Sequence, residues 1–233
     1  MTRSALPFVR ALAAASALLA AVPALAGSFT HNPGGGRFSV GVTSLKEQKF
    51  EGVVAQQYDF SCGSAALATL LTHHYDEPTG ELPIFKSMLK HGNKEKIRTQ
   101  GFSLLDMKKA LARRGFKANG YDVPLAKLED VGIPAVALIN VRGYKHFVVI
   151  KGLTKDKVLV GDPALGMKIY PREKFTKMWN GLLFVITSDM KVAQASFNAP
   201  EQWKLKPNAP LGQALTREIL SQIRLDLPGP NEF

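Results

Sequence analysis

Hydrophobic positions repeat with a helical period in the first half of the chain. One run consists of small and aliphatic residues and predicts a buried helix that begins next to Cys62. A later run starts with Ser103 and Asp106, which form a capping-box pattern in its looser, Asp-containing form. The polar and basic residues 92–101 predict a surface loop between the helices. The predicted helices cover residues 62–75, 82–91 and 103–114.

In the second half the pattern changes to short apolar runs, which is typical of strands. Their short connections favour hairpins and therefore a mainly antiparallel sheet. Short helices are predicted at residues 124–130 and 172–179. The predicted strands cover residues 116–123, 134–139, 146–153, 158–161, 167–170 and 182–188. We expect an α+β fold, with an N-terminal helical part packed on this sheet.

The first 26 residues have the pattern of a secretory signal peptide. Arg3 and Arg10 form a basic segment, and an apolar stretch too short to span a bilayer comfortably follows them. Ala24-Leu25-Ala26 then reads as a cleavage site. We expect cleavage after Ala26 and export to a bacterial periplasm, with an uncleaved membrane anchor as the alternative. No later stretch is long and apolar enough to span a membrane.

The segments that flank the predicted helices and sheet show less regular patterns. Residues 27–49 are expected to be flexible apart from a first strand at 38–42, and a second strand is predicted at 49–54. The triple glycine at 34–36 reads as a linker, with self-processing as the alternative. Several prolines predict a linker over 189–210. Residues 211–233 contain an amphipathic helix, which packs on the domain or docks a partner or membrane surface.

Charge and composition narrow the classes of partner. The 233 residues carry a formal net charge of +11, and 45% of them are hydrophobic, an ordinary value for a globular protein. Removing the signal peptide leaves 11 − 2 = +9, because Arg3 and Arg10 are its charged residues. The basic residues are spread along the chain without a basic-aromatic binding motif. We therefore expect a solvated basic surface and no nucleic-acid partner.

The chain has one cysteine, Cys62. A lone thiol in an exported protein cannot form an intrachain disulfide, so it is either buried or chemically active. At the start of a helix the positive end of the helix dipole favours the thiolate. Gln56 offers an amide that can bind a developing oxyanion, and Gly63 permits close approach. The alternative is a buried structural cysteine.

Two further polar residues lie at the ends of predicted strands. His146 opens one apolar strand and Asp162 ends the next, and a thiol, an imidazole and a carboxylate are the parts of an activated nucleophile. A two-residue turn at 155–156 would leave Asp162 opposite Val149, too far along the strand from His146. We therefore predict a wider loop, centred on Thr154, or a bulge. Alone, His146 would read as a core-edge histidine and Asp162 as a turn residue.

Together these residues resemble a known family. Gln56, Cys62-Gly63, His146-Phe147-Val148 and Asp162-Pro163 match, in type and spacing, the double-glycine leader peptidases, which are papain-like cysteine peptidases best known from bacteriocin exporters. The resemblance covers about residues 50–186, and we expect the peptidase domain at 50–188. It implies Cys62 as nucleophile, His146 as base, Asp162 as orienting residue and Gln56 as oxyanion donor.

The chain departs from that family in two ways. Asp59-Phe60-Ser61 stands where the family often has an acidic residue directly before the cysteine, and a transporter domain is absent. The resemblance therefore implies a free-standing member. No cofactor is expected, and the histidines, including the adjacent His73 and His74, show no metal-ligand spacing.

The resemblance implies an endopeptidase that cuts a peptide or protein after two small residues, usually Gly-Gly. Free-standing exported relatives occur beside bacterial secretion systems, including those for functional amyloid (FapD-like proteins), so a secretion or amyloid partner is expected. Two alternatives stay open. One is a cell-wall peptidase or amidase of the NlpC type, and the other is a peptidase-like binding module that holds a glycine motif without cutting it.

Overall fold

The computed structural model describes residues 28–31, 38–41 and 45–204, and the chain divides into two units at residues 43 and 44. In the first unit, strand β1 (Ser28–His31) pairs antiparallel with β2 (Phe38–Gly41). Strand β2 was expected, whereas β1 lies in a segment expected to be flexible. The triple glycine, the predicted signal peptide and the predicted C-terminal helix lie outside the described residues.

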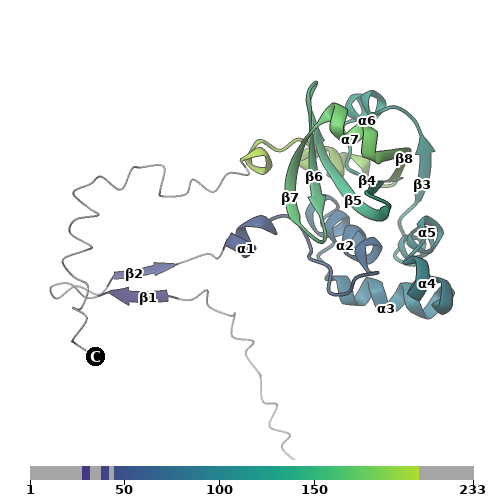
Figure 1. Ribbon diagram of the computed structural model, residues 1–233, viewed down its shortest axis with the longest axis horizontal. Coiled ribbons are helices and arrows are strands. Elements are labelled where there is room, and N and C mark those ends of the chain that lie inside the picture. The colour runs from purple at the N-terminus through teal and green to yellow at the C-terminus, as the bar shows by residue number, and fades with distance from the viewer. Residues whose placement is uncertain (1–27, 32–37, 42–44, 205–233) are drawn as a thin grey trace, which may run out of the picture. The chain divides into compact units, whose positions relative to one another are not determined.

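The second unit begins with helices (Figure 1). The helix predicted from Cys62 and the two that follow it at 82–91 and 103–114 are confirmed. Ser103 and Asp106 form the expected capping box: each side chain accepts a hydrogen bond from the other residue's backbone N–H, at 3.2 and 3.0 Å. The helices are α1 (Leu45–Lys49), α2 (Cys62–His74), α3 (Glu81–His91), α4 (Lys94–Gln100) and α5 (Leu104–Arg113).

A six-stranded sheet follows, with strand order β3-β8-β4-β5-β6-β7 and every neighbouring pair antiparallel. The predicted antiparallel sheet and the α+β class are therefore confirmed. The strands are β3 (Ala118–Asp122), β4 (Ala135–Val141), β5 (Tyr144–Leu153), β6 (Lys157–Asp162), β7 (Gly166–Pro171) and β8 (Trp179–Ile186). Helices α6 (Leu125–Val131) and α7 (Arg172–Met178) connect strands and lie together at the upper end of the sheet in Figure 1.

Helix α2 is the element that joins the helical part to the sheet. It packs on β5 and on α3, and almost all of its side chains are buried. Alanines favour the helical state and, being small, let the helix approach the sheet closely. Burial of each leucine contributes about 1.5–3 kcal/mol relative to exposure. The N-terminus of α2, which carries Cys62, is therefore held firmly against the sheet.

The segment predicted as a surface loop at 92–101 instead contains helix α4. Its N-cap is Asn93, whose side-chain oxygen accepts the backbone N–H groups of Glu95 and Lys96, both at 3.1 Å. Gly101 ends the helix with a φ of 74°, a conformation that favours glycine. The polar composition hid the helix, although Asn93 is a typical N-cap residue.

The strand predicted at 49–54 is also wrong. Residues after α1 turn back on themselves, with the Val53 N–H bonded to the Phe50 carbonyl at 2.9 Å and Gly52 at a φ of 76°. Val53 is buried in a small cluster with Leu159 and Met167. The segment around Val53 therefore contacts the sheet through this apolar side chain and does not form one of its strands.

The described part of the predicted linker, 189–204, is structured. It contains helix α8 (Met190–Ser196) and a 3-10 helix, η1 (Pro200–Trp203). Helix α8 packs on α2, and its Ala193 is fully buried. The segment therefore packs on the domain and is not an unstructured connection. In the part of the chain that the structure describes, no helix is long and apolar enough to cross a membrane.

Candidate active site

Cys62 is the first residue of α2 and is 8% exposed. The first helical hydrogen bond runs from the Ala65 N–H to the Ser61 carbonyl at 3.1 Å, so the N–H groups of the first turn point out of the helix end beside the thiol. At Gly63 a β-carbon would lie 3.3 Å from Phe102 and 3.5 Å from Phe147. The absence of a side chain there lets α2 pack directly against the neighbour of His146.

The turn before Cys62 is held by its own side chains and by a buried carboxylate. The Ser61 hydroxyl donates to the Tyr58 carbonyl at 2.8 Å and accepts the Tyr58 N–H at 3.1 Å. Glu81, at the start of α3, accepts the backbone N–H of Gln57 at 2.9 Å and is 3.5 Å from the Ser64 hydroxyl. Glu81 thus connects the Gln56 segment to α2, a role that the sequence did not reveal.

His146 and Asp162 form a buried pair. The Nε2 atom of His146 lies 2.8 Å from Oδ1 of Asp162, and both side chains are almost fully buried. The same carboxylate oxygen accepts the N–H groups of Ala164 and Leu165 at 2.8 and 3.1 Å. Burial raises the pKa of Asp162, but the bonds to His146 and to these N–H groups outweigh burial and lower it.

The other ring nitrogen of His146, Nδ1, is buried and has no hydrogen-bond partner among the described residues. Nδ1 is therefore available for an interaction with the Cys62 thiol. Burial lowers the pKa of His146, but the interactions with Asp162 and Cys62 outweigh burial and raise it to about 9. The imidazole is therefore protonated at neutral pH, the state that stabilises a neighbouring thiolate.

The register of the β5–β6 hairpin explains how these two side chains meet. Leu153 pairs with Val158, and the next pair, Thr154 and Lys157, encloses a two-residue turn at 155–156, so the prediction of a wider loop is wrong. The alternative prediction, a bulge, is confirmed, and the bulge lies at Lys151. An unbulged ladder from this turn would place Asp162 opposite Val149, on the other face from His146. The bulge shifts the pairing by one residue, and Asp162 lies level with Val148, diagonally across from His146.

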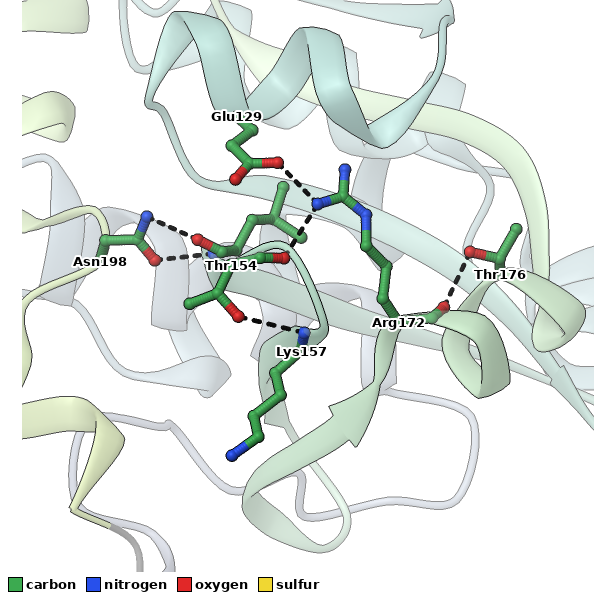
Figure 2. Close-up of polar contacts among 7 residues, drawn as sticks. Glu129, Thr154, Lys157, Arg172, Thr176 and Asn198 are labelled. Atoms are coloured by element: carbon green, nitrogen blue, oxygen red, sulfur yellow. Dashed lines mark hydrogen bonds and ion pairs between the residues drawn. The ribbon is translucent and has the colours of Figure 1, made fainter.

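The bulge is held from both sides. Lys151 is completely buried, and its ammonium group donates to the Gly52 carbonyl at 2.5 Å. Burial lowers the pKa of Lys151 to about 8. Asn198, after α8, donates its backbone N–H to the Lys151 carbonyl at 3.0 Å. Its side chain binds the Leu153 N–H and C=O at 2.7 and 2.9 Å (Figure 2). A lysine inside an apolar strand, followed by Gly152, was the signal of this bulge in the sequence.

Figure 2 also shows the outer end of the hairpin. Thr154 accepts the Lys157 N–H through its hydroxyl and binds Arg172 through its carbonyl, at 3.1 and 2.9 Å. Arg172 also pairs with Glu129 of α6 at 2.6 Å. These contacts fix the two-residue turn, so the register at the His146 end is set from the opposite end of the strands.

Gln56 lies between the two halves of the site. Its backbone N–H binds the carbonyl of Pro163, the residue after Asp162, at 2.9 Å. Its side-chain amide donates to the Tyr58 carbonyl at 3.1 Å, while Oε1 is buried and has no hydrogen-bond partner within the described part of the chain. The amide nitrogen carries two hydrogens, so one remains for a substrate.

Tyr144 is a further residue of the site that the sequence analysis missed. Its ring stacks on the His146 imidazole with 5.9 Å between centroids, and its hydroxyl donates to the Asp59 carbonyl at 3.0 Å. The position two residues before His146 on one strand was the available signal, since such residues share a face. Among the described residues, no group of three or more His, Cys, Asp or Glu side chains is arranged to hold a metal ion.

Comparison with known proteins places this geometry in a family. The model of the Peptidase C39 family matches residues 51–191, which is more than half of the chain. The "Probable functional amyloid protease FapD" of Pseudomonas aeruginosa is 47% identical over 154 residues, covering 66% of this chain and 68% of the relative. The protein of the same name from Pseudomonas fluorescens is 43% identical over 174 residues, covering 74% and 77%.

A solved structure shares the fold. The peptidase domain of Streptococcus ComA, described as a bi-functional ABC transporter involved in a quorum-sensing pathway, matches with a TM-score of 0.50 at 22% identity. The match covers 57% of this chain and 96% of that domain. The family match also decides between the two enzyme classes left open by the sequence, in favour of the double-glycine type over the NlpC type. The chain belongs to the Peptidase C39 family of cysteine peptidases.

Proposed function

We propose that the protein is an exported cysteine endopeptidase that cuts a peptide or protein after a pair of small residues such as Gly-Gly. The observation that carries the proposal is the buried His146–Asp162 pair, whose second imidazole nitrogen is left to the Cys62 thiol. A buried pair of this kind keeps the imidazole protonated and correctly oriented. A structural histidine would need no such arrangement.

The proposed reaction uses four side chains. In the resting site the proton of the Cys62 thiol lies on His146, and the thiolate attacks the scissile carbonyl carbon, forming a C–S bond. The oxyanion accepts hydrogen bonds from the Cys62 N–H and the Gln56 amide. His146 then gives its proton to the leaving amine as the C–N bond breaks. Finally His146 takes a proton from water, and the hydroxide attacks the thioester. The C–S bond breaks and the Cys62 thiolate leaves beside the protonated His146, while Asp162 keeps the imidazole oriented throughout.

Two considerations support the substrate class. The spacing of Gln56, Cys62, His146 and Asp162 resembles that of peptidases that cut after glycine pairs. The relatives at 47% and 43% identity carry the name of functional amyloid proteases. We infer that the substrate belongs to a bacterial secretion system, with a component of functional amyloid export as the leading candidate.

Incubation with peptides tests this function. A peptide with a central Gly-Gly pair is compared with one that carries Val-Val at the same place, and products are identified by mass spectrometry. We expect cleavage after the second glycine by the wild type, none of the Val-Val peptide, and none by Cys62→Ala. Binding of the Gly-Gly peptide by the wild type without cleavage would instead favour the binding module.

Export is the remaining part of the proposal and rests on the pattern of residues 1–26. The full-length chain is produced in a Gram-negative host, and the periplasmic fraction is analysed by intact mass. We expect a mature protein that begins at Gly27. A protein found at full-length mass in the membrane fraction would support the uncleaved anchor instead.

A further inference from the structure

The two central groups of the proposed site come from separate parts of the fold. Cys62 follows an irregular turn formed by Tyr58 to Ser61, and His146 lies on β5. Thiol–imidazole chemistry depends on their separation to within a fraction of an ångström. A contact that fixes the turn relative to β5 therefore has direct consequences for reactivity.

Tyr144 makes such a contact. It is the first residue of β5, and the preceding turn fixes its backbone, with Arg142 and Gly143 both at positive φ, 52° and 91°. The Gly143 N–H donates to the Asn140 side chain at 2.7 Å, which closes this turn. The tyrosine side chain therefore starts from a rigid base.

From this base the side chain reaches both halves of the site. Its ring lies on the imidazole of His146 with an angle of 28° between the planes. Its hydroxyl donates to the carbonyl of Asp59, three residues before Cys62. In the part of the chain that the structure describes, this is the hydrogen bond that joins the 58–61 turn to β5. Ser61 does not assist, because its hydroxyl turns back to Tyr58.

Tyr144 is an exposed residue, so packing in the core does not explain these contacts. The residue is 55% exposed, and an exposed tyrosine is ordinarily free to rotate. Burial and the nearby Cys62, Asp59 and Asp162 raise the pKa of its hydroxyl, so it stays protonated and able to donate. The ring of this exposed residue is stacked on the His146 imidazole, and its hydroxyl is bonded to the turn that precedes Cys62. We refer to these two contacts together as a clamp.

We propose that Tyr144 is a positioning residue that holds Cys62 and His146 in reactive alignment. The proposal rests on the roles given to Cys62 and His146 under the proposed function. It adds that the stacked ring sets the plane of the imidazole, while the hydroxyl sets the position of the turn. The two contributions can be separated by substitution, because phenylalanine keeps the ring and removes the hydroxyl.

The test compares Tyr144→Phe and Tyr144→Ala with wild type, and uses the exposed Tyr121 of β3 for matched control variants. The readouts are the pH profile of Cys62 alkylation by iodoacetamide and the kcat and KM for the Gly-Gly peptide. Tyr144→Phe is expected to lower the alkylation rate at pH 6 and kcat about fivefold, the factor that corresponds to one ordinary hydrogen bond. Tyr144→Ala is expected to lower both about twentyfold, because stacking is lost as well.

The outcomes separate this inference from the proposed function. A residue that acts only on stability would change the melting temperature but leave the alkylation profile and kcat of the folded protein unchanged, which would overturn the clamp. If wild type itself alkylates with the profile of an ordinary thiol, the assigned roles of Cys62 and His146 fail, and the clamp fails with them. Tyr121→Phe and Tyr121→Ala should match wild type in both readouts.

Discussion

Among the residues whose burial the structure describes, two histidines are buried, and their surroundings differ in one decisive respect. His146 on β5 is 5% exposed and His74 at the end of α2 is 1% exposed. His146 bonds to the carboxylate of Asp162, whereas His74 lies 2.7 Å from the hydroxyl of Ser196. The pKa of His146 is raised to about 9, while burial and then the charge of Lys151 lower that of His74 to about 2.

The partner of a buried histidine, rather than its burial, therefore decides whether the pKa of the imidazole is raised or lowered. Burial disfavours the charged imidazole in both places. At His146 a negative partner overcomes this effect, and at His74 a positive neighbour, Lys151, adds to it. His74 is consistent with a structural role, since its bond to Ser196 attaches α8 to α2.

The largest expected effect is on the reactivity of Cys62 and comes from removing His146, with removal of His74 as the comparison. Without His146 there is no imidazolium to stabilise the thiolate, and an ordinary thiol, with a pKa near 8.5, is only about 0.3% ionised at pH 6. We expect His146→Ala to lower the alkylation rate at pH 6 about a hundredfold. His74→Gln should leave the rate within a factor of two. Equal effects of the two substitutions would remove the distinction between the two sites.

Replacing Asp162 should make the His146 environment resemble that of His74. In Asp162→Asn the negative partner is gone and burial dominates, so the pKa of His146 should fall from about 9 to below 6.5. The imidazole is then neutral at pH 7, and Cys62 alkylation there should slow about tenfold. An NMR titration of the imidazole measures the pKa. Asp156→Asn, in the exposed hairpin turn, is the control and should leave it unchanged.

The bulge beside Lys151 should contribute to stability as well as to register. Asn198→Ala removes two side-chain hydrogen bonds and leaves the Leu153 backbone groups without these partners. We expect the free energy of unfolding in urea to fall by about 1–3 kcal/mol. Lys177→Ala removes the exposed pair with Glu173 and should cost no more than about 0.5 kcal/mol. Similar losses for both would show that the bulge is not specifically supported.

The smallest effect concerns stability against pH, where the two histidines have opposite signs. His146 has a raised pKa, so its contribution is complete below pH 6.5 and is lost as pH rises from 6.5 towards 9. His74 has a lowered pKa, so stability falls as the unfolded chain takes up a proton below pH 6.5, by about 1 kcal/mol between pH 6.5 and 5.5.

His74→Gln should therefore flatten the acid side of the stability curve. A loss of similar slope remains over this pH range from His73, whose pKa burial and then the charge of Lys151 lower to about 4, so the acid slope is reduced but not abolished. His91→Gln changes an exposed histidine at the end of α3 and serves as the control. If both substitutions leave the acid slope as it is in wild type, His74 is not the group that titrates there.

Much of the fold followed from local pattern. Helices α2 and α5 were predictable because small apolar residues and a capping box act within a few residues, and the sheet because its hairpins connect neighbouring runs. The candidate site residues were predicted because their types and spacing match a family pattern. Helix α4 was missed because composition outweighed the capping signal of Asn93.

The remaining features depend on contacts between distant segments. The hydrogen bonds between the Asn198 side chain and the Leu153 backbone join residues 45 positions apart in the sequence. The hydrogen bond from Tyr144 to Asp59 joins residues 85 positions apart. Neither contact leaves a periodic trace in the sequence. The bulge lies between these cases, because the need for it followed from residue counting, while its position was indicated only by Lys151 and Gly152 within an apolar strand.

The bulge also decides which changes in length the hairpin can accept. Deletion of Lys151 would remove the extra residue and retain the pairing of Val149 with Gly161, so His146 and Asp162 would stay on one face. Deletion of Val148, three positions earlier, would turn His146 to the opposite face and separate the pair. Strand β5 thus contains one place where a lost residue is absorbed, and at positions beside it the same loss reverses the side chains that precede the deletion.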